Sequence, residues 1–355
     1  MGVNAAFWSG RRVLLTGHTG FKGGWLSVWL QSLGAQVYGI ALAPDSEPSL
    51  WQATGLADRV DGSITDLRDQ QALSDRVLAF APEVVFHLAA QPLVRASYRD
   101  PVETYATNVM GTVNLLDALR RCASVEAIVV ITTDKCYENR EWHWPYRETD
   151  RLGGFDPYSN SKACAELVCA SFRDAFFKPA GVALATARAG NVIGGGDWAR
   201  ERLVPDVLRA WDAGEELSLR YPNATRPWQH VLDPLNGYLL LAEHLLTASP
   251  GDATAWNFGP DSNGVASVAE VVARMASYWR DGAARWCSAT DPQPHEAGLL
   301  ALDSSRARQL LGWQPRWTLD VALKQTLAWH QAWRSGDDTH ALCLQQIALH
   351  QGESI

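Results

Sequence analysis

The chain has 355 residues, of which 47% are hydrophobic and 20% charged, and its formal net charge is −8. This length allows about two domains with a large core, and this composition excludes a disordered or fibrous chain. The negative charge argues against nucleic acid or a membrane surface as the main partner, because no broad basic field is available.

The first half of the chain alternates short apolar strands with helix-like segments. We predict strands at 12–16, 36–42, 83–88, 127–132 and 182–187. After the first strand, apolar side chains recur with helical spacing from Trp25 to Leu33, and Gly34 ends the pattern. Strands alternating with helices predict βαβ units and a parallel sheet covered on both faces. The expected fold class is therefore α/β, a Rossmann-type doubly wound parallel sheet.

A glycine-rich turn, Thr16-Gly17-His18-Thr19-Gly20-Phe21-Lys22-Gly23, follows the first strand and opens a helix. Gly17 permits the tight turn, Gly20 lets the backbone approach a pyrophosphate, and Gly23 lets the helix pack closely on the strand. The helix N-terminus supplies N–H groups and the positive end of a dipole. A glycine triplet alone is weak evidence, but this position in a βαβ series predicts a dinucleotide site.

The acid that usually holds the adenosine ribose is missing after the second strand. Residues 39–44 contain no carboxylate, so Asp45 or Ser46 substitutes for it, or the ribose is held loosely. No arginine is present there to bind a 2′-phosphate, which favours NAD over NADP. Asp66 ends another apparent strand, where it either accepts from the adenine amino group or caps a helix at 67–77.

Tyr158 and Lys162 are spaced i, i+4, so they share one face of a helix whose first turn suits Pro157. A neighbouring lysine favours the phenolate, which would make Tyr158 a base near neutral pH. Such a pair is common on protein surfaces. Here it gains weight from the strand that ends in Thr132-Thr133-Asp134-Lys135, since ligands bind at the carboxyl ends of strands in open α/β sheets.

After about Asn191 the pattern loosens, and glycine or proline clusters separate shorter segments. Residues 203–208 and 268–279 predict helices, and two amphipathic helices follow Trp313. We expect a Rossmann domain at 1–190 that also carries the catalytic residues. A smaller substrate-binding domain at 191–355 would return some segments to it.

These motifs resemble the extended short-chain dehydrogenase/reductases, and among them the nucleotide-sugar 4,6-dehydratases, especially the CDP-glucose branch. The resemblance extends over nearly the whole chain. It rests on TGHTGFKGGWL at 16–26, HLAAQPLVR at 87–95, TNVMGT at 107–112, TTDKCYENREW at 132–142, DPYSNSKACAE at 156–166, RAGNVIGGGDW at 188–198, RPWQHVLDP at 226–234, NFGP at 257–260, PHEA at 294–297 and LGWQPRW at 311–317.

The resemblance implies a catalytic triad of Thr133, Tyr158 and Lys162 with NAD as the cofactor. Tyr158 would take the proton from the sugar O4 while hydride leaves C4 for NAD, Thr133 would bond the same oxygen, and Lys162 would hold the nicotinamide ribose. Asp134 would protonate the departing C6 hydroxyl, which requires a raised pKa. Lys135, typical of the CDP-glucose branch, would be a neutral base at C5, a cation that stabilises the enolate, or part of a relay.

The resemblance also implies contacts to the cofactor and the substrate, which would be CDP-glucose. Beyond the residues already named, the implied cofactor contacts are Thr19, Phe21, Lys22, Leu67, Leu88, Ala89, Ala90 and Asn108. The implied substrate contacts are Gln91, Asn191, Arg202, Arg226 and His295. Arg226 would clamp the diphosphate bidentately. The implied assembly is a homodimer or homotetramer that pairs through helices around 99–121 and 158–177.

Three alternatives remain open at this point. A nucleotide-sugar 4-epimerase needs the tyrosine and the cofactor but no acid/base pair for elimination, so Asp134 and Lys135 argue against it. A 4,6-dehydratase for another nucleotide sugar is compatible with these residues, because cytidine rests on the resemblance alone. A regulator that binds dinucleotide without catalysis would not need an intact triad.

The cysteine and histidine patterns bear on the cellular compartment. Six cysteines form no CxxC pair and nine histidines form no HExxH, so we expect reduced thiols and no metal site. No apolar run reaches the ~18 residues that span a bilayer, and no signal-peptide pattern opens the chain. We therefore expect a cytoplasmic enzyme, in deoxysugar synthesis for a surface polysaccharide such as O-antigen.

Overall fold

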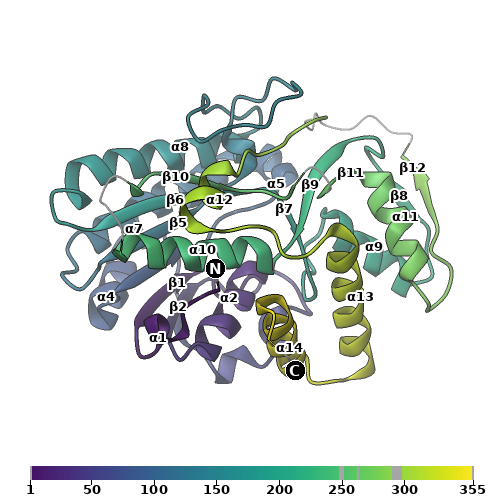
Figure 1. Ribbon diagram of the computed structural model, residues 1–355, viewed down its shortest axis with the longest axis horizontal. Coiled ribbons are helices and arrows are strands. Elements are labelled where there is room, and N and C mark those ends of the chain that lie inside the picture. Colours follow the sequence, from purple (N-terminus) through teal and green to yellow (C-terminus); the bar gives the residue numbers. More distant parts are fainter. Residues whose placement is uncertain (1, 248–251, 262–263, 290–297, 354–355) are drawn as a thin grey trace.

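The computed structural model describes residues 2–247, 252–261, 264–289 and 298–353. Its centre is a seven-stranded sheet with the order β10-β6-β5-β4-β1-β2-β3, in which every neighbouring pair is parallel (Figure 1). The strands are β1 Arg12–Thr16, β2 Gln36–Ala41, β3 Asp61–Ile64, β4 Val84–His87, β5 Ala127–Ile131, β6 Ala183–Ala189 and β10 Ala255–Phe258. The strand order reverses between β1 and β4, which creates the crevice where such sheets bind ligands.

The central strands are buried on both faces because their side chains alternate between two hydrophobic cores. Val13 and Leu15 of β1 belong to one core, and Leu14 between them belongs to the other. This alternation follows from the two-residue period of a strand. It explains why the strands read as continuous apolar runs in the sequence.

Helices cover both faces of the sheet (Figure 1). The first core includes side chains of α2 (Phe21–Ser32) and α10 (Leu232–Thr247). The second includes side chains of α4 (Gln70–Phe80), α7 (Gly111–Leu119) and α8 (Pro157–Phe172). The predicted fold class, a doubly wound parallel sheet, is confirmed.

Short helical segments occupy the connections between the strands. They are α1 Ala5–Trp8, α3 Leu50–Ala53, α5 Val94–Arg99, α6 Pro101–Tyr105, the 3₁₀ helices η1 Leu56–Asp58 and η3 Asp134–Cys136, and the π-helical turns η2 Ala106–Met110 and η4 Arg173–Phe177. One helix starts later than we predicted. The Asp69 side chain accepts the Ala72 N–H at 3.0 Å and caps α4, so the alternative in which Asp66 caps this helix is wrong.

The second half of the chain adds two small sheets and five further helices to the described structure. The small sheets are β11-β9-β7 and β12-β8. Their strands are β7 Asn191–Ile193, β8 Leu217–Leu219, β9 Thr225–His230, β11 Val265–Ser267 and β12 Trp286–Ser288, and the helices are α9 Leu203–Asp212, α11 Val268–Tyr278, α12 Ser305–Leu311, α13 Leu319–Ser335 and α14 Thr339–Gln351. Other parts of this half return to the main sheet and its helices. β10 pairs with β6 of the sheet, and α14 packs on α2.

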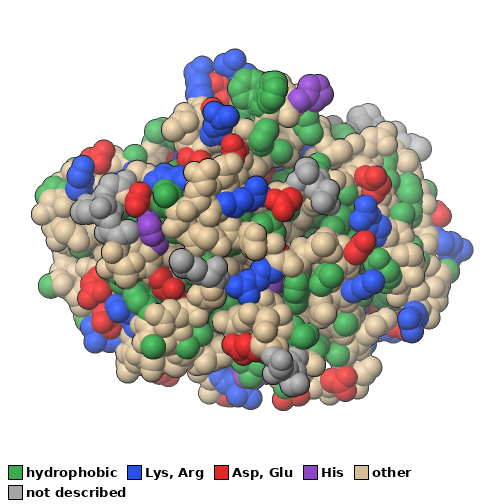
Figure 2. All heavy atoms as spheres, viewed as in Figure 1, with side chains coloured by type: hydrophobic (Ala, Val, Ile, Leu, Met, Phe, Trp, Pro, Cys, Tyr) green, Lys and Arg blue, Asp and Glu red, His purple; other side chains and the backbone are tan. Residues whose placement is uncertain are grey.

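The strand predictions agree with the structure to within two residues at each end, and the helices predicted at 203–208 and 268–279 are α9 and α11. No strand was predicted at the position of β10. On the face of the molecule in Figure 2, acidic and basic side chains are interspersed. Within the described residues, no helix has both the length and the apolar character needed to cross a membrane.

Candidate active site

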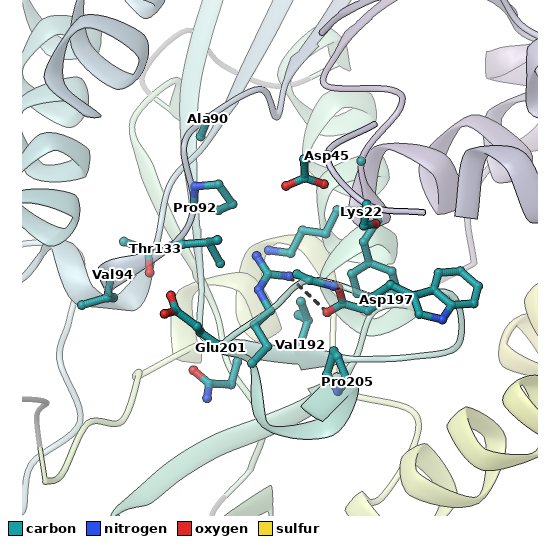
Figure 3. A pocket seen from close by; sticks show the side chains of 18 of the residues that line it. Lys22, Asp45, Ala90, Pro92, Val94, Thr133, Val192, Asp197, Glu201 and Pro205 are labelled. Atoms are coloured by element: carbon teal, nitrogen blue, oxygen red, sulfur yellow. Dashed lines mark hydrogen bonds and ion pairs between the residues drawn. The ribbon is translucent and has the colours of Figure 1, made fainter. Parts of the chain in front are cut away.

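A cavity of about 550 Å³ opens at the carboxyl ends of the main-sheet strands, with walls from both halves of the chain (Figure 3). The predicted site residues that line it are Gly17, Thr19, Gly20, Phe21, Lys22, Gly23, Asp66, Leu67, Leu88, Ala89, Ala90, Thr133, Asp134, Lys135, Tyr158, Lys162, Asn191, Arg202 and Arg226. Gln91 and Asn108 do not line it. His295 lies outside the described residues.

The three glycines of the turn have different structural requirements. Gly17 has φ +78°, and a Cβ there would lie 2.8 Å from the Ala89 backbone nitrogen. A Cβ on Gly23 would lie 2.0 Å from the Gly17 carbonyl oxygen, so this glycine allows α2 to approach the turn. A Cβ on Gly20 would meet nothing closer than 3.4 Å, so protein packing does not require that glycine. Gly20 lines the cavity, and its lack of a side chain leaves room there for a ligand.

The N-terminus of α2 faces this cavity and suits an anion. Its N-cap is Gly20, which provides no side-chain hydrogen bond to the first-turn N–H groups. These groups and the helix dipole are therefore available to a phosphate. Lys22 lies in the same turn, where burial and the nearby charges of Arg202 and Lys162 lower its pKa to about 7.

The residues considered for the adenosine end also line the cavity. Asp45 and Ser46 follow β2, and Asp66 follows β3. Asp66 is already engaged with Arg68, at 2.6 Å between Nη2 and Oδ2, and this hydrogen bond lowers the pKa of the carboxyl. The Thr19 hydroxyl donates to the Leu42 carbonyl at 2.8 Å and fixes the turn against the end of β2.

The catalytic candidates come from the end of β5 and the start of α8. The Thr133 hydroxyl donates to Asp134 Oδ1 at 3.0 Å, and Thr133 also acts to lower the pKa of Tyr158. The helix that carries Tyr158 and Lys162 begins as the sequence predicted, with Pro157 in its first turn and Asp156 accepting the Ser159 N–H at 2.9 Å. The two elements bring the acid and the tyrosine to the wall of one cavity.

Burial dominates the ionisation of Tyr158 and Lys162. It raises the pKa of Tyr158 to about 12, and Thr133 and the Arg202 charge oppose the rise. The sequence had suggested Lys162 for that opposing role. Burial lowers the pKa of Lys162 to about 8, and its ammonium donates to the Ile131 carbonyl at 3.0 Å.

Asp134 is a buried carboxyl, 1% exposed. Burial raises its pKa, although Lys135, Thr133 and Arg226 act in the opposite direction. Its Oδ2 atom has no hydrogen-bond partner among the described residues. A carboxyl that is stabilised in its neutral form and has a spare oxygen is suited to donate a proton to a ligand.

A buried ion pair behind the catalytic centre was missed from the sequence. Arg188 on β6 and Glu166 on α8 are 2.8 Å apart, with side chains 4% and 3% exposed. Glu166 also accepts from the hydroxyls of Thr132, at 2.5 Å, and Thr186, at 2.6 Å. The network joins the end of β5 to β6 and α8 and thereby fixes the elements that carry the catalytic groups. Two charged residues inside otherwise apolar segments were the only sequence signal of it.

Gln91 and Asn108 bond to each other rather than to the cavity. Asn108 accepts the Gln91 N–H at 2.8 Å, and its amide donates to the Ser161 hydroxyl at 2.9 Å. The Gln91 amide donates to the Thr104 hydroxyl at 2.9 Å. The pair therefore attaches the loop after β4 to α6 and α8.

The C-terminal half contributes the substrate candidates. Asn191, Arg202 and Arg226 line the cavity, and Arg202 is paired with Asp197 at 3.1 Å. Arg226 is 5% exposed and donates to the Thr225 carbonyl at 2.9 Å. Five other lining residues with charged side chains were not singled out from the sequence, and these are Arg95, Asp197, Glu201, Asp206 and Arg220.

Comparison with known proteins identifies the family. Residues 14–326 match the family model described as GDP-mannose 4,6 dehydratase. The chain is 50% identical over 341 residues to the CDP-glucose 4,6-dehydratase of Salmonella typhimurium, covering 95% of each chain. It is 27% identical to the UDP-glucose 4-epimerase of Halalkalibacterium halodurans, covering 92% of this chain and 98% of that one.

Solved structures share the fold. The dTDP-glucose 4,6-dehydratase of Bacillus anthracis, solved with NAD, matches with a TM-score of 0.77 at 20% identity, covering 93% of this chain and 99% of that one. The DesIV dehydratase of Streptomyces venezuelae matches with a TM-score of 0.78 at 21% identity, covering 93% and 99%. By family model and by sequence identity, this chain belongs to the GDP-mannose 4,6-dehydratase family, within the extended short-chain dehydrogenase/reductases.

Proposed function

We propose that the chain is an NAD-dependent 4,6-dehydratase that converts CDP-glucose to CDP-4-dehydro-6-deoxyglucose. The observation that carries the proposal is the buried Asp134 carboxyl, which has a raised pKa, accepts a hydrogen bond from Thr133 and lines one cavity with Tyr158. This arrangement provides a base and an acid within one cavity, as oxidation followed by elimination requires. The choice of CDP-glucose is supported by the 50% identity to the Salmonella enzyme.

The residues of the glycine turn fit NAD. The uncapped start of α2 would hold the pyrophosphate, and Gly20 leaves the room for its approach. Asp45, Ser46 and Asp66 line the same cavity and would contact the adenosine end. When bound, NAD supplies the reversible hydride acceptor that oxidation at C4 and reduction at C6 both require.

Tyr158 would remove the proton from the sugar O4 while Thr133 holds the same oxygen. Its pKa of about 12 in the free protein means that the phenolate needs a further positive charge nearby, which Arg202 already supplies in part. Lys162 would contribute from its position one turn further along α8. Since its pKa of about 8 leaves Lys162 mostly protonated at neutral pH, its ammonium would donate a hydrogen bond to a bound ribose hydroxyl.

Asp134 would protonate the C6 hydroxyl as it leaves, after the 4-ketone has acidified the C5–H bond. Lys135 is the next residue and lines the same cavity, so it would act at C5 as the base or as a charge that stabilises the enolate. Arg202 and Arg226 would bind the diphosphate, since both line the cavity beside the catalytic centre. We accordingly divide the chain into a catalytic Rossmann domain, 1–190, and a mainly substrate-binding domain, 191–355.

A homo-oligomer is the second part of the proposal. Val102, Met110 and Leu167 expose 77%, 50% and 60% of their surface on the segments around α6, η2 and α8. Large apolar side chains gathered on neighbouring helices favour a protein partner. A second copy pairing through 99–121 and 158–177 would cover them.

The free cysteines are compatible with a reducing cytoplasm, where nucleotide sugars for surface polysaccharides such as O-antigen are made.

The decisive experiment is incubation of the purified protein with CDP-glucose, with and without added NAD, followed by the alkaline absorbance of a 4-keto sugar. We expect product from CDP-glucose, and stimulation by NAD because no acid immediately follows β2. The absence of keto product from CDP-, dTDP- and GDP-sugars would contradict the dehydratase proposal. Conversion of UDP-glucose to UDP-galactose instead would favour a 4-epimerase.

A further inference from the structure

Glu201 is a strained residue in the wall of the cavity, immediately before α9. Its φ is +64°, a left-handed conformation that non-glycine residues rarely adopt. The Arg220 guanidinium donates to its carbonyl oxygen at 3.1 Å and helps to hold this conformation. Such strain persists only where the surroundings enforce it, and it is frequent at ligand sites.

The conformation directs the Glu201 side chain toward the other half of the protein. Its Oε1 atom lies 3.1 Å from Arg99 and 4.0 Å from Arg95, both on α5. The next residue, Arg202, turns to Asp197 instead. The two successive residues thus contact different parts of the cavity wall, and the link from Glu201 to α5 joins the two halves of the chain.

The second carboxylate oxygen of Glu201 is not satisfied by the protein. Oε2 is buried, and no described residue bonds to it. A charged acceptor that is withdrawn from water without a partner is costly, so this oxygen requires a donor. A donor that enters with the substrate would remove the cost only in the complex.

The position of Glu201 indicates which part of the substrate supplies this donor. Figure 3 shows Glu201 on the side of the cavity where Thr133 and Val94 lie, away from Lys22 and Asp45. Lys22 and Asp45 belong to the cofactor end, whereas Thr133 belongs to the catalytic centre. The nearest ligand group is therefore the hexose rather than the adenosine.

We propose that Glu201 is a substrate-positioning residue whose carboxylate accepts a hydrogen bond from the 2- or 3-hydroxyl of the hexose. The proposal rests on the proposed function, because the reaction alters C4, C5 and C6 and leaves those two hydroxyls unchanged. A fixed contact to either would hold the ring while C4 faces Tyr158. The pairing with α5 would keep the carboxylate oriented for this contact.

The test combines the Glu201→Ala variant with substrates that lack one hydroxyl. Calorimetry with NADH present, which cannot accept the C4 hydride, would compare the binding of CDP-glucose, CDP-2-deoxyglucose and CDP-3-deoxyglucose without turnover. For the unmodified protein we expect one of the deoxy sugars to bind about 10- to 100-fold more weakly, the usual effect of losing a hydrogen bond to a charged group. E201A should bind that deoxy sugar and CDP-glucose equally, and both proteins should bind CDP alone equally. E201A that still discriminates between all three sugars as the unmodified protein does would overturn the proposal.

Two further variants separate this role from a structural one. Glu201→Gln keeps the shape and a neutral acceptor, so KM for CDP-glucose should rise less than in E201A, with kcat changed less than KM in both. Glu215→Ala, at an exposed position, is the matched control and should change neither. A fall in kcat alone, with KM constant, would count against positioning. Turnover of CDP-glucose by the unmodified protein tests the proposed function separately, since the binding comparison needs no catalysis.

Discussion

The cofactor end of the cavity uses backbone groups from one continuous stretch, residues 16–23, whereas the catalytic centre uses side chains from β5, α8 and the segments after β6. At the cofactor end, the absence of side chains lets the backbone pack closely at Gly17 and Gly23, and at Gly20 it would leave room for NAD. At the catalytic centre, burial raises the pKa of Asp134, as a proton donor requires, and it also raises the pKa of Tyr158, which a nearby positive charge must offset. The first region depends on local geometry, and the second depends on what the whole fold places around it.

The largest effect should follow the removal of the proposed acid. Asp134→Asn is nearly isosteric but cannot donate the same proton, so dehydration should slow by about 100- to 10,000-fold. Oxidation at C4 should continue, and NADH should accumulate in single-turnover absorbance measurements. Asp174→Asn, on an exposed part of η4, is the control. Dehydration by D134N at the unmodified rate would show that burial of this carboxyl serves another purpose.

Substitutions at two glycines of the turn should separate a loss of stability from a loss of NAD binding. Gly23→Ala would force a Cβ against the Gly17 carbonyl, and we expect unfolding to become easier by about 1–3 kcal/mol. Gly20→Ala should fold with nearly unchanged stability but bind NAD about tenfold or more weakly, because its methyl group would occupy the approach to the helix N-terminus. Thermal unfolding and NAD titration would measure the two effects. Equal losses of stability in both variants would contradict the distinction.

The pKa of Lys22 predicts how NAD binding depends on pH. With a pKa of about 7 in the free protein, Lys22 loses its proton above neutral pH, whereas a bound pyrophosphate would hold the proton on. The complex then carries more protons than the free protein, so affinity should fall as the pH rises above about 7, by at most about tenfold per unit. Lys22→Arg should flatten this dependence, since arginine stays charged. The same slope in both proteins would exclude Lys22 as its source.

The smallest expected effect concerns the N-terminus of α4. Asp69→Ala removes the cap of α4 and should lower the free energy of unfolding by about 0.5–2 kcal/mol, with kcat unchanged. Asp66→Ala should cost less stability, because Asp66 lies outside the helix and pairs with the half-exposed Arg68. Chemical denaturation of both variants would test the assignment. A larger loss in D66A would return the capping role to Asp66.

The sequence alone determined the features that depend on neighbouring residues. Strand periods, the glycine spacing and the i, i+4 relation of Tyr158 to Lys162 are set within short windows, and so the parallel sheet and the cofactor turn could be predicted. The helix at 67–77 was placed too early, because Asp66 and Asp69 are equally good caps in sequence and only the packing of α4 selects between them.

Only the tertiary structure decided the features that depend on distant residues. Gln91 and Asn108 bond to each other instead of lining the cavity. The charge of Arg202, rather than that of Lys162, lowers the pKa of Tyr158. One carboxylate oxygen each of Asp134 and Glu201 has no hydrogen-bond partner within the described residues. The tertiary structure also returned β10 to the main sheet. Desolvation and charge pairing arise from segments far apart in the chain, so no local pattern reports them.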